Sequence, residues 1–226
     1  MYSRQELIDY ADISSFAYDD TDGFDFRSYD EILEVTGNGS NSSFSGISYY
    51  DETDNELVIG FGGTEGFGDA IADVQLLFGP PAQAGEAVSF AIDSYYAAAS
   101  MGLEISDITF TGHSLGGYLA QYAESVIDFG PISSDAVVFN SPGYNLSGGS
   151  DEVTYIYSEE DDWDFVSRFI HNFGDRLSDE VYYVEGEGEF DGFLNAHYLG
   201  PLREALADGN DITQDNDGWS FWDIFG

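Results

Sequence analysis

Apolar and polar residues along this chain follow two periods, one typical of helices and one typical of strands. In residues 6–18 and 85–101 the apolar positions recur at helical spacing, which predicts an amphipathic helix in each segment. In residues 47–63, "ISYYDETDNELVIGFGG", two apolar runs flank a polar turn. This pattern predicts an antiparallel pair of strands.

From residue 107 onward, short apolar segments alternate with helical ones. We expect strands at "DITFTG", "DAVVFNSPG", "EVTYIYSEEDD" and "VYYVEG", and helices at 118–129 and 200–209. A weaker helical pattern covers residues 69–78. Strands that alternate with helices indicate an α/β fold with a mostly parallel central sheet and helices on both faces.

The chain length suits one domain. We expect a single domain over residues 1–226, of which about residues 211–226 form an acidic and aromatic C-terminal tail, "DITQDNDGWSFWDIFG". No apolar run approaches the roughly 18 residues that a transmembrane helix needs. The first residues, "MYSRQELIDYADISSFAYDD", lack the apolar core of an ordinary secretory signal.

The charge balance is strongly acidic. The chain has 44 Asp and Glu residues against 5 basic residues, all of them Arg, for a formal net charge of −39. Such a surface repels nucleic-acid phosphates, so nucleic acids are excluded as partners. Salt screens self-repulsion, so we expect a salt-adapted protein, secreted without an N-terminal signal, whose stability rises with salt. The absence of Cys excludes disulfides, thiolate catalysis and Cys-ligated zinc.

The segment "ITFTGHSLGGYLAQYAE" places Ser114 between Gly112 and Gly116, after a strand and before a helix. This G-x-S-x-G arrangement is the nucleophile turn of α/β-hydrolases. The two glycines let the strand and the helix approach without a Cβ clash. The N–H of Leu115, at the helix N-terminus, then points to where an oxyanion would form. We expect Ser114 to be a nucleophile rather than an ordinary serine in a turn.

Several segments resemble the class 3 lipase family, the fungal-type lipases and their bacterial relatives. "TGHSLGGYLAQ" resembles the family's nucleophile turn and following helix, and "LVIGFGGTEGFGDAIAD" resembles its oxyanion strand and loop. "SSFAY", "FNSPG" and "DFVSRF" resemble its N-terminal helix, a later strand and its acid loop. The resemblance implies an α/β-hydrolase fold, lipid ester hydrolysis without a required cofactor, and Thr64 as the second oxyanion donor.

The chain departs from the family pattern at one position, and the role of one segment has two interpretations. Gly62 stands where the family usually has Arg, which implies a more flexible oxyanion loop. Residues 65–81 occupy the place of the family's lid, and their apolar side chains suit an acyl chain. Plain core packing of an amphipathic helix would give the same pattern.

A serine nucleophile needs a base and a carboxylate that orients the base, and in this fold the chain order is Ser, acid, His. The histidines are His113, His171 and His197. His197 lies just before a late helix, where the fold delivers its base, so we expect it to be the base, with His171 as the alternative. His113 is expected to serve in packing.

The acid should follow a strand at its carboxyl end, as "EEDDWDFVSRF" does. Asp164 best fits the family pattern Asp-x-Val, and its neighbours Trp163 and Phe165 can bury it partly. We therefore expect Asp164 to be the acid, with Asp162 as the alternative.

Together these residues predict a serine carboxylic-ester hydrolase for lipid acyl esters, a lipase or phospholipase A1-like enzyme acting at a lipid–water interface. Two other interpretations stay open: an esterase for soluble or polymeric esters, and a non-catalytic hydrolase-fold module that binds a partner. "DDTDGFDF" and "DITQDNDGW" contain Asp-x-Asp-Gly as calcium loops do, so structural calcium is an alternative to plain acidic loops. No metal is expected in catalysis.

Overall fold

The computed structural model describes residues 2–17, 29–35, 44–62, 83–143, 152–159, 180–186 and 199–214. In chain order, this part contains α1 (Arg4–Phe16), β1 (Tyr29–Val35), β2 (Gly46–Asp51), β3 (Glu56–Phe61), α3 (Ala84–Ser100), β4 (Asp107–His113), α4 (Leu115–Val126), β5 (Ser133–Phe139), β6 (Val153–Glu159), β7 (Val181–Glu185), α6 (Leu199–Asp208) and β8 (Ile212–Gln214).

The strands of the described part form one eight-stranded sheet, in which each strand lies beside its neighbours in the sequence. Strands β3 to β7 run parallel. At one edge β1, β2 and β3 form an antiparallel meander, and at the other edge β8 pairs antiparallel with β7. The mostly parallel sheet and the antiparallel pair at 47–63 that the sequence predicts are confirmed.

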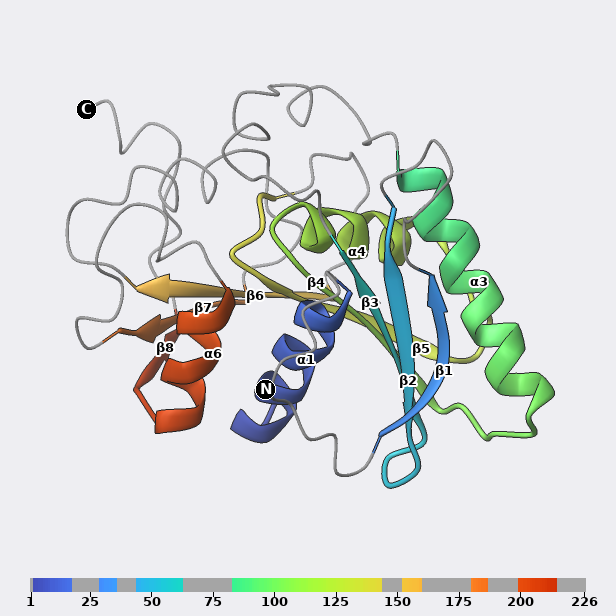
Figure 1. Cartoon of the computed structure of the whole chain (residues 1–226), viewed down its shortest axis with the longest axis horizontal. Coiled ribbons are helices and arrows are strands. Elements are labelled where there is room, and N and C mark those ends of the chain that lie inside the picture. The colour runs from blue at the N-terminus through green and yellow to red at the C-terminus, as the bar shows by residue number, and fades with distance from the viewer. Residues whose placement is uncertain are drawn as a thin grey trace.

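Helices cover both faces of this sheet, α3 and α4 on one face and α1 and α6 on the other (Figure 1). The side chains of β3 alternate between the faces: Leu57 and Ile59 join the core under α3 and α4, whereas Val58 joins the core under α1 and α6. Gly60 faces α1, and a Cβ there would press on Ile13. Burial on both faces explains why these strands are almost continuously apolar.

The predicted helices at 6–18, 85–101, 118–129 and 200–209 are confirmed as α1, α3, α4 and α6. The apolar pattern does not predict β1 or β8. The acidic side chains of β1 at positions 30, 31 and 34 are exposed on an edge strand, and Asp and Glu have low strand propensity. β8 is only three residues long and lies at the start of the predicted tail. The weak helical pattern at 69–78 and residues 215–226 lie outside the described part.

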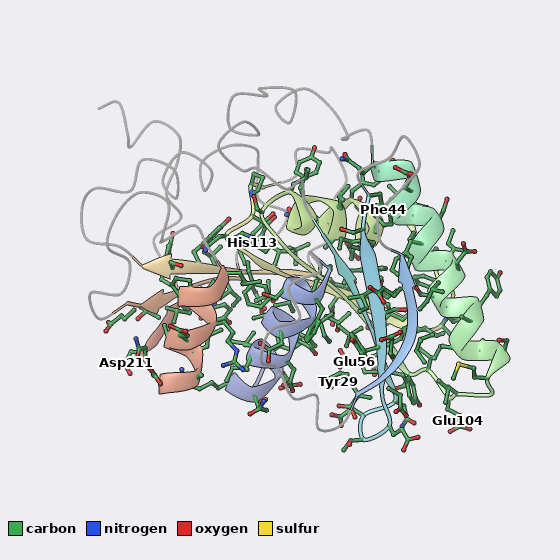
Figure 2. All side chains as sticks on the ribbon, viewed as in Figure 1. Tyr29, Phe44, Glu56, Glu104, His113 and Asp211 are labelled. Atoms are coloured by element: carbon green, nitrogen blue, oxygen red, sulfur yellow. The ribbon has the colours of Figure 1, made fainter. Side chains whose placement is uncertain are left out.

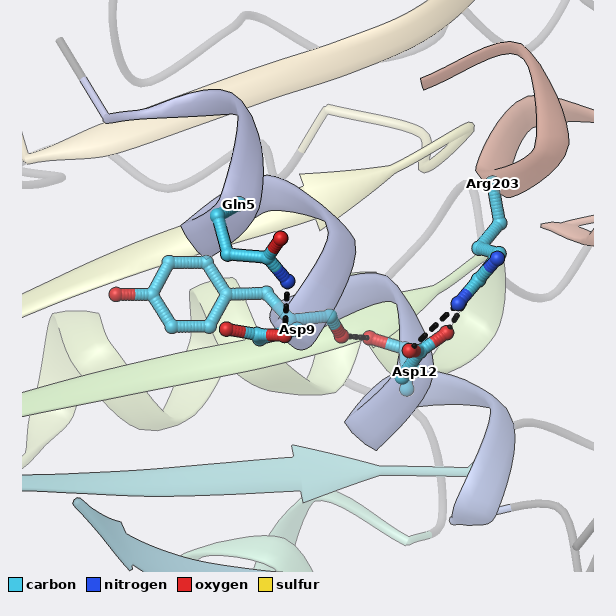
Figure 3. A network of polar contacts seen from close by, with 6 residues as sticks. Gln5, Asp9, Asp12 and Arg203 are labelled. Atoms are coloured by element: carbon cyan, nitrogen blue, oxygen red, sulfur yellow. Dashed lines mark hydrogen bonds and ion pairs between the residues drawn. The ribbon is translucent and has the colours of Figure 1, made fainter. Parts of the chain in front are cut away.

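Two arginines join α1 to α6. Arg203 of α6 donates two hydrogen bonds to the Asp12 carboxylate of α1, from Nε to Oδ1 at 2.7 Å and from Nη2 to Oδ2 at 3.1 Å (Figure 3). In the opposite direction, Arg4 of α1 donates to the carbonyl oxygens of Leu206 and Asn210 at the end of α6. Burial raises the pKa of the Asp12 carboxyl, and the Arg203 hydrogen bonds oppose that rise. The first and last helices of the described part are thus fixed to each other.

Candidate active site

Ser114 lies at the junction between β4 and α4. Its backbone has φ 54° and ψ −121°, a conformation that residues with a side chain rarely adopt and that costs about 1–3 kcal/mol. The Ser114 N–H donates to the carbonyl oxygen of Phe139 in β5 at 3.0 Å, and the Ser114 carbonyl accepts from the Tyr118 N–H at 3.1 Å. The surrounding backbone therefore holds the strained turn, and the strand-turn-helix arrangement expected around Ser114 is present.

Gly112 and Gly116 provide the space that this turn needs. A Cβ on Gly112 would overlap the backbone of Gly116, and a Cβ on Gly116 would overlap the carbonyl of Phe61 at the end of β3. Neither glycine is among those with positive φ, so close approach rather than an unusual backbone angle requires them. The motif thereby brings the ends of β3 and β4 and the start of α4 together at Ser114.

Leu115 is the first residue of α4. Its N–H therefore belongs to a helix N-terminus, where unpaired backbone N–H groups and the helix dipole favour negative charge. Because Phe61 contacts Gly116, the chain leaving β3 starts beside the same helix N-terminus. Thr64, the other predicted oxyanion donor, follows β3 by three residues and lies outside the described part.

Gly62 is enclosed by backbone from two other segments. Its N–H donates to the Ser45 carbonyl oxygen at 3.0 Å, and a Cβ at Gly62 would overlap the Ala17 carbonyl and Ser45 Oγ. An Arg side chain, which the resembling family usually has here, finds no room. The end of β3 is instead held by Ala17, which follows α1, and by Ser45, which precedes β2. The loop expected to be more flexible, from residue 63, lies outside the described part.

Polar side chains support the elements beneath the turn. Gln121 of α4 is fully buried, and its amide nitrogen donates to Ser141 Oγ and to the Pro142 carbonyl oxygen, both at 3.0 Å. The amide oxygen of Gln121 accepts from the Tyr155 hydroxyl of β6 at 2.8 Å. Sequence reasoning missed this support, for which a glutamine inside the apolar helix "YLAQYA" is the available signal.

Apolar surface borders Ser114 along α4. Leu115 and Tyr118 are buried against each other, and Tyr122 packs against them. Burial raises the pKa of Tyr118 to about 12, so its hydroxyl is neutral at physiological pH. This side of the turn therefore offers apolar contacts and an uncharged hydroxyl.

His113 ends β4 directly before Ser114 and is buried, with 8% of its surface exposed. Figure 2 shows His113 and Glu56 near opposite ends of the sheet, as the pairing of β3 with β4 requires. The packing role expected for His113 stays a prediction.

Other residues named from the sequence lie outside the described part of the chain: Thr64, Asp162, Asp164, His171, His197 and the segment 65–81. The described elements nevertheless end close to them in sequence. β6 ends at Glu159, five residues before Asp164, and α6 begins at Leu199, two residues after His197. The assignments of acid, base, second oxyanion donor and lid stay predictions.

Within the described ranges, no group of three or more His, Asp or Glu side chains could hold a metal ion. The segments predicted as calcium loops lie outside these ranges, except for residues 211–214. None of the described helices is long and apolar enough to cross a membrane.

Solved structures match this chain, whereas the two sequence comparisons find no match. No family model matches it, and no curated protein matches its sequence. A triacylglycerol lipase from Penicillium expansum superposes with a TM-score of 0.60 at 16% identity, over 81% of this chain and 80% of that one. Lip2 lipase from Yarrowia lipolytica gives 0.56 at 15%, over 80% and 78%. A triacylglycerol lipase in which a serine protease triad forms the catalytic centre gives 0.56 at 17%, over 81% and 82%. These similarities confirm the predicted fold class.

Proposed function

We propose that this chain, which has the α/β-hydrolase fold of the fungal-type lipases that its sequence resembles, is a serine carboxylic-ester hydrolase acting on lipid acyl esters. The observation that carries the proposal is the backbone of Ser114, strained between a parallel strand and a helix N-terminus. Strain of this kind persists where the surrounding structure requires it, and it accumulates at active sites. An ordinary serine in a Gly-rich turn has no need of it.

The first half of the reaction forms an acyl-enzyme. His197 accepts the hydroxyl proton of Ser114 while Oγ attacks the ester carbonyl carbon, and Asp164 orients the imidazole. The N–H groups of Leu115 and Thr64 stabilise the tetrahedral oxyanion. His197 then gives its proton to the departing alcohol, and the acyl group remains on Ser114.

The second half releases the acid. Water gives a proton to His197 and attacks the acyl carbonyl, the same N–H groups stabilise the oxyanion, and the ester bond to Ser114 breaks as Oγ recovers the proton. Removing one oxyanion donor in such sites costs about 2.7–4 kcal/mol. No step requires a metal ion or an organic cofactor.

The substrate class follows from the surroundings of Ser114 and from the fold. The apolar cluster of Leu115, Tyr118 and Tyr122 suits an acyl chain rather than a charged group. The similar solved structures are triacylglycerol lipases, which favours lipid esters over other esters. We include phospholipase A1-like activity and action at a lipid–water interface in the proposal. A lid at residues 65–81 would give a rise in activity above substrate solubility.

The deciding experiment is labelling with a fluorophosphonate probe, followed by mass spectrometry of the modified peptide. We expect an adduct on Ser114 and hydrolysis of p-nitrophenyl esters, triacylglycerol emulsions and phospholipids. Ser114→Ala should lower turnover by about 10⁴-fold or more while leaving the melting temperature unchanged. Ser94→Ala is the matched control, because Ser94 is a buried serine of α3 whose hydroxyl has no described hydrogen-bond partner.

A chain that neither labels nor hydrolyses any ester would be a non-catalytic module. Turnover that survives in purified Ser114→Ala would overturn the assignment of the nucleophile. Activity confined to soluble or polymeric esters would keep the mechanism and replace the substrate class.

The proposal includes where the enzyme works and whether it binds structural calcium. A net charge of −39 without any Lys suits a secreted enzyme that works in salt. Structural calcium at the two Asp-x-Asp-Gly segments would add stability and no chemistry, and chelator addition followed by thermal melting tests it.

A further inference from the structure

We propose that Asn140 is a positioning residue that holds the nucleophile turn in register with the strand leading to the acid. The inference rests on the proposed function, and it names a residue outside the catalytic groups. Asn140 directly follows β5, between the turn at Ser114 and the end of β6.

The backbone at Asn140 touches both neighbours of β5. The residue before it, Phe139, accepts the Ser114 N–H at 3.0 Å. Asn140 itself donates its N–H to the Ile156 carbonyl oxygen of β6 at 2.9 Å. It has φ 43°, a left-handed conformation that Asn tolerates better than most residues. Two consecutive residues therefore connect the nucleophile turn on one side to β6 on the other.

The side chain of Asn140 extends the pairing of β5 with β6 beyond its last backbone pair. That ladder ends at Phe139 and Ile156. Past this point, Oδ1 of Asn140 accepts the Ser158 N–H at 3.0 Å, and Nδ2 donates to Ser158 Oγ at 3.2 Å. Only an amide offers an acceptor and a donor side by side in this way without a charge. Both residues are buried, so water cannot replace these bonds.

The chain after Asn140 cannot tilt away, because the next two residues are fixed as well. Gln121 holds Ser141 and Pro142 against α4, and the Tyr157 hydroxyl of β6 donates to the Ser141 carbonyl at 2.9 Å. Ser141 and Pro142 therefore cannot move to compensate for a shift of Asn140. It would change the position of Ser158 relative to Ser114.

The proposed acid, Asp164, lies six positions after Ser158 in the sequence. Asn140 thus helps to fix the end of β6, which is the last described part of the chain before the proposed acid. Loss of its amide should let the end of β6 shift and should weaken the contact of the acid with His197. A nearby carboxylate raises the pKa of a histidine, so the pKa of the base should fall when that contact weakens.

The test compares Asn140→Gly with Thr154→Val in the full chain. Glycine accepts the left-handed backbone and removes the side chain with its amide. Thr154 lies in β6, at the end of the strand opposite to Ser158, and its hydroxyl donates to the Glu180 carboxylate at 3.1 Å. Thr154→Val therefore controls for the loss of a side-chain hydrogen bond in β6. Both are assayed for kcat and KM on a p-nitrophenyl ester between pH 5 and 9, with melting temperatures recorded.

For Asn140→Gly we expect kcat to fall about tenfold or more with KM nearly unchanged. We also expect the acidic limb of the kcat/KM profile to move to lower pH by about half a unit or more. Thr154→Val should keep the wild-type profile. If Asn140→Gly does not fold, Ser158→Ala removes the partner hydroxyl and should give the same shift at smaller size.

An acidic limb that stays at the wild-type pH in a folded Asn140 or Ser158 variant would overturn the inference, because a merely structural residue changes the amount of active enzyme and not its titration. A wild-type chain that neither labels nor hydrolyses esters would instead refute the proposed function itself.

Discussion

The two ends of the parallel strands bury polar groups of different kinds. Near Ser114, at the carboxyl end, the buried side chains that fix the chain are amides and hydroxyls, those of Gln121, Asn140 and Ser158. At the amino end, the buried acceptor is a carboxyl group. Glu56 of β3 is 9% exposed and accepts hydrogen bonds from the hydroxyls of Tyr10 at 2.8 Å and Thr109.

The difference separates what must stay fixed from what can change with pH. Amides and hydroxyls keep their hydrogen bonds over the whole physiological range, so the side chains of Gln121, Asn140 and Ser158 do not titrate there. Burial raises the pKa of Glu56, and the charge of Asp51 adds to the rise. Glu56 thus adds a titrating group to the core at the end of the sheet far from the proposed chemistry.

The largest change in stability is expected from adding a side-chain atom at Gly116, near the carboxyl end of the parallel strands. Gly116→Ala puts a Cβ onto the Phe61 carbonyl, and we expect a loss of about 3 kcal/mol in unfolding free energy together with most of the activity. Gly85→Ala in α3 is the control, because a Cβ there meets nothing within 4 Å. Urea unfolding measures both. A Gly116→Ala protein as stable as the control would show that the turn has room to relax.

A smaller change, a gain in stability, is expected from replacing Glu56 at the amino end of the parallel strands. The raised pKa means that folded Glu56 holds its proton more tightly than the unfolded chain, whose value is near 4.5. Its favourable contribution is complete below about pH 4.5 and is lost as pH rises through the raised pKa. Gln keeps the acceptor without the charge, so Glu56→Gln should stabilise the protein by about 1 kcal/mol at pH 7 and not at pH 4.

The control for this prediction is Glu52→Gln, which removes one carboxylate at an exposed turn position and should leave the unfolding free energy at pH 7 nearly unchanged. Unfolding in urea at several pH values compares the three proteins. A Glu56→Gln variant that is less stable than the wild type at pH 7 would show that the carboxylate is needed in its ionised form.

The smallest effect is expected from salt, which tests whether the exposed acidic residues and buried Glu56 affect stability independently. Raising salt from about 0.1 to 1 M should raise the melting temperature of the wild type, because the Debye length falls to about 3 Å and surface repulsion is screened. The stability difference between Glu56→Gln and the wild type should change by less than about 0.3 kcal/mol, since buried groups are screened little. A difference that collapses with salt would mean that surface charges, not burial, act on Glu56.

The sequence predicts those features whose physical cause is local. The strained turn could be predicted because Gly112, Ser114 and Gly116 lie within five residues of each other. The central strands could be predicted because burial on both faces makes them apolar throughout. β1 was beyond prediction from the apolar pattern, since an edge strand tolerates the acidic side chains that usually indicate a loop.

Features that depend on distant partners are not visible in the sequence. Asn140 meets Ser158 across eighteen residues, and Gln121 meets Ser141 across twenty, so neither pairing follows from spacing. In the sequence, Glu56 follows a polar turn and would be expected to be solvated. In the structure, α1 packs over it and Tyr10 donates a hydrogen bond to its carboxyl group. The acid, base and lid stay predictions from resemblance and chain order.

The arginine contacts between α1 and α6 bear on the order in which the chain folds during synthesis. Because strand order follows chain order, each new strand can join the edge of a sheet that already exists, and Ser114 is in place early. α6 is made last among the helices described, and it must return across about 190 residues to reach Asp12. A nascent chain that still lacks α6 would leave open the apolar surface that α6 covers beside α1, although Ser114 has already been made. Docking of α6 on α1 is therefore expected to be a late step of folding, after the strands on either side of Ser114 have paired.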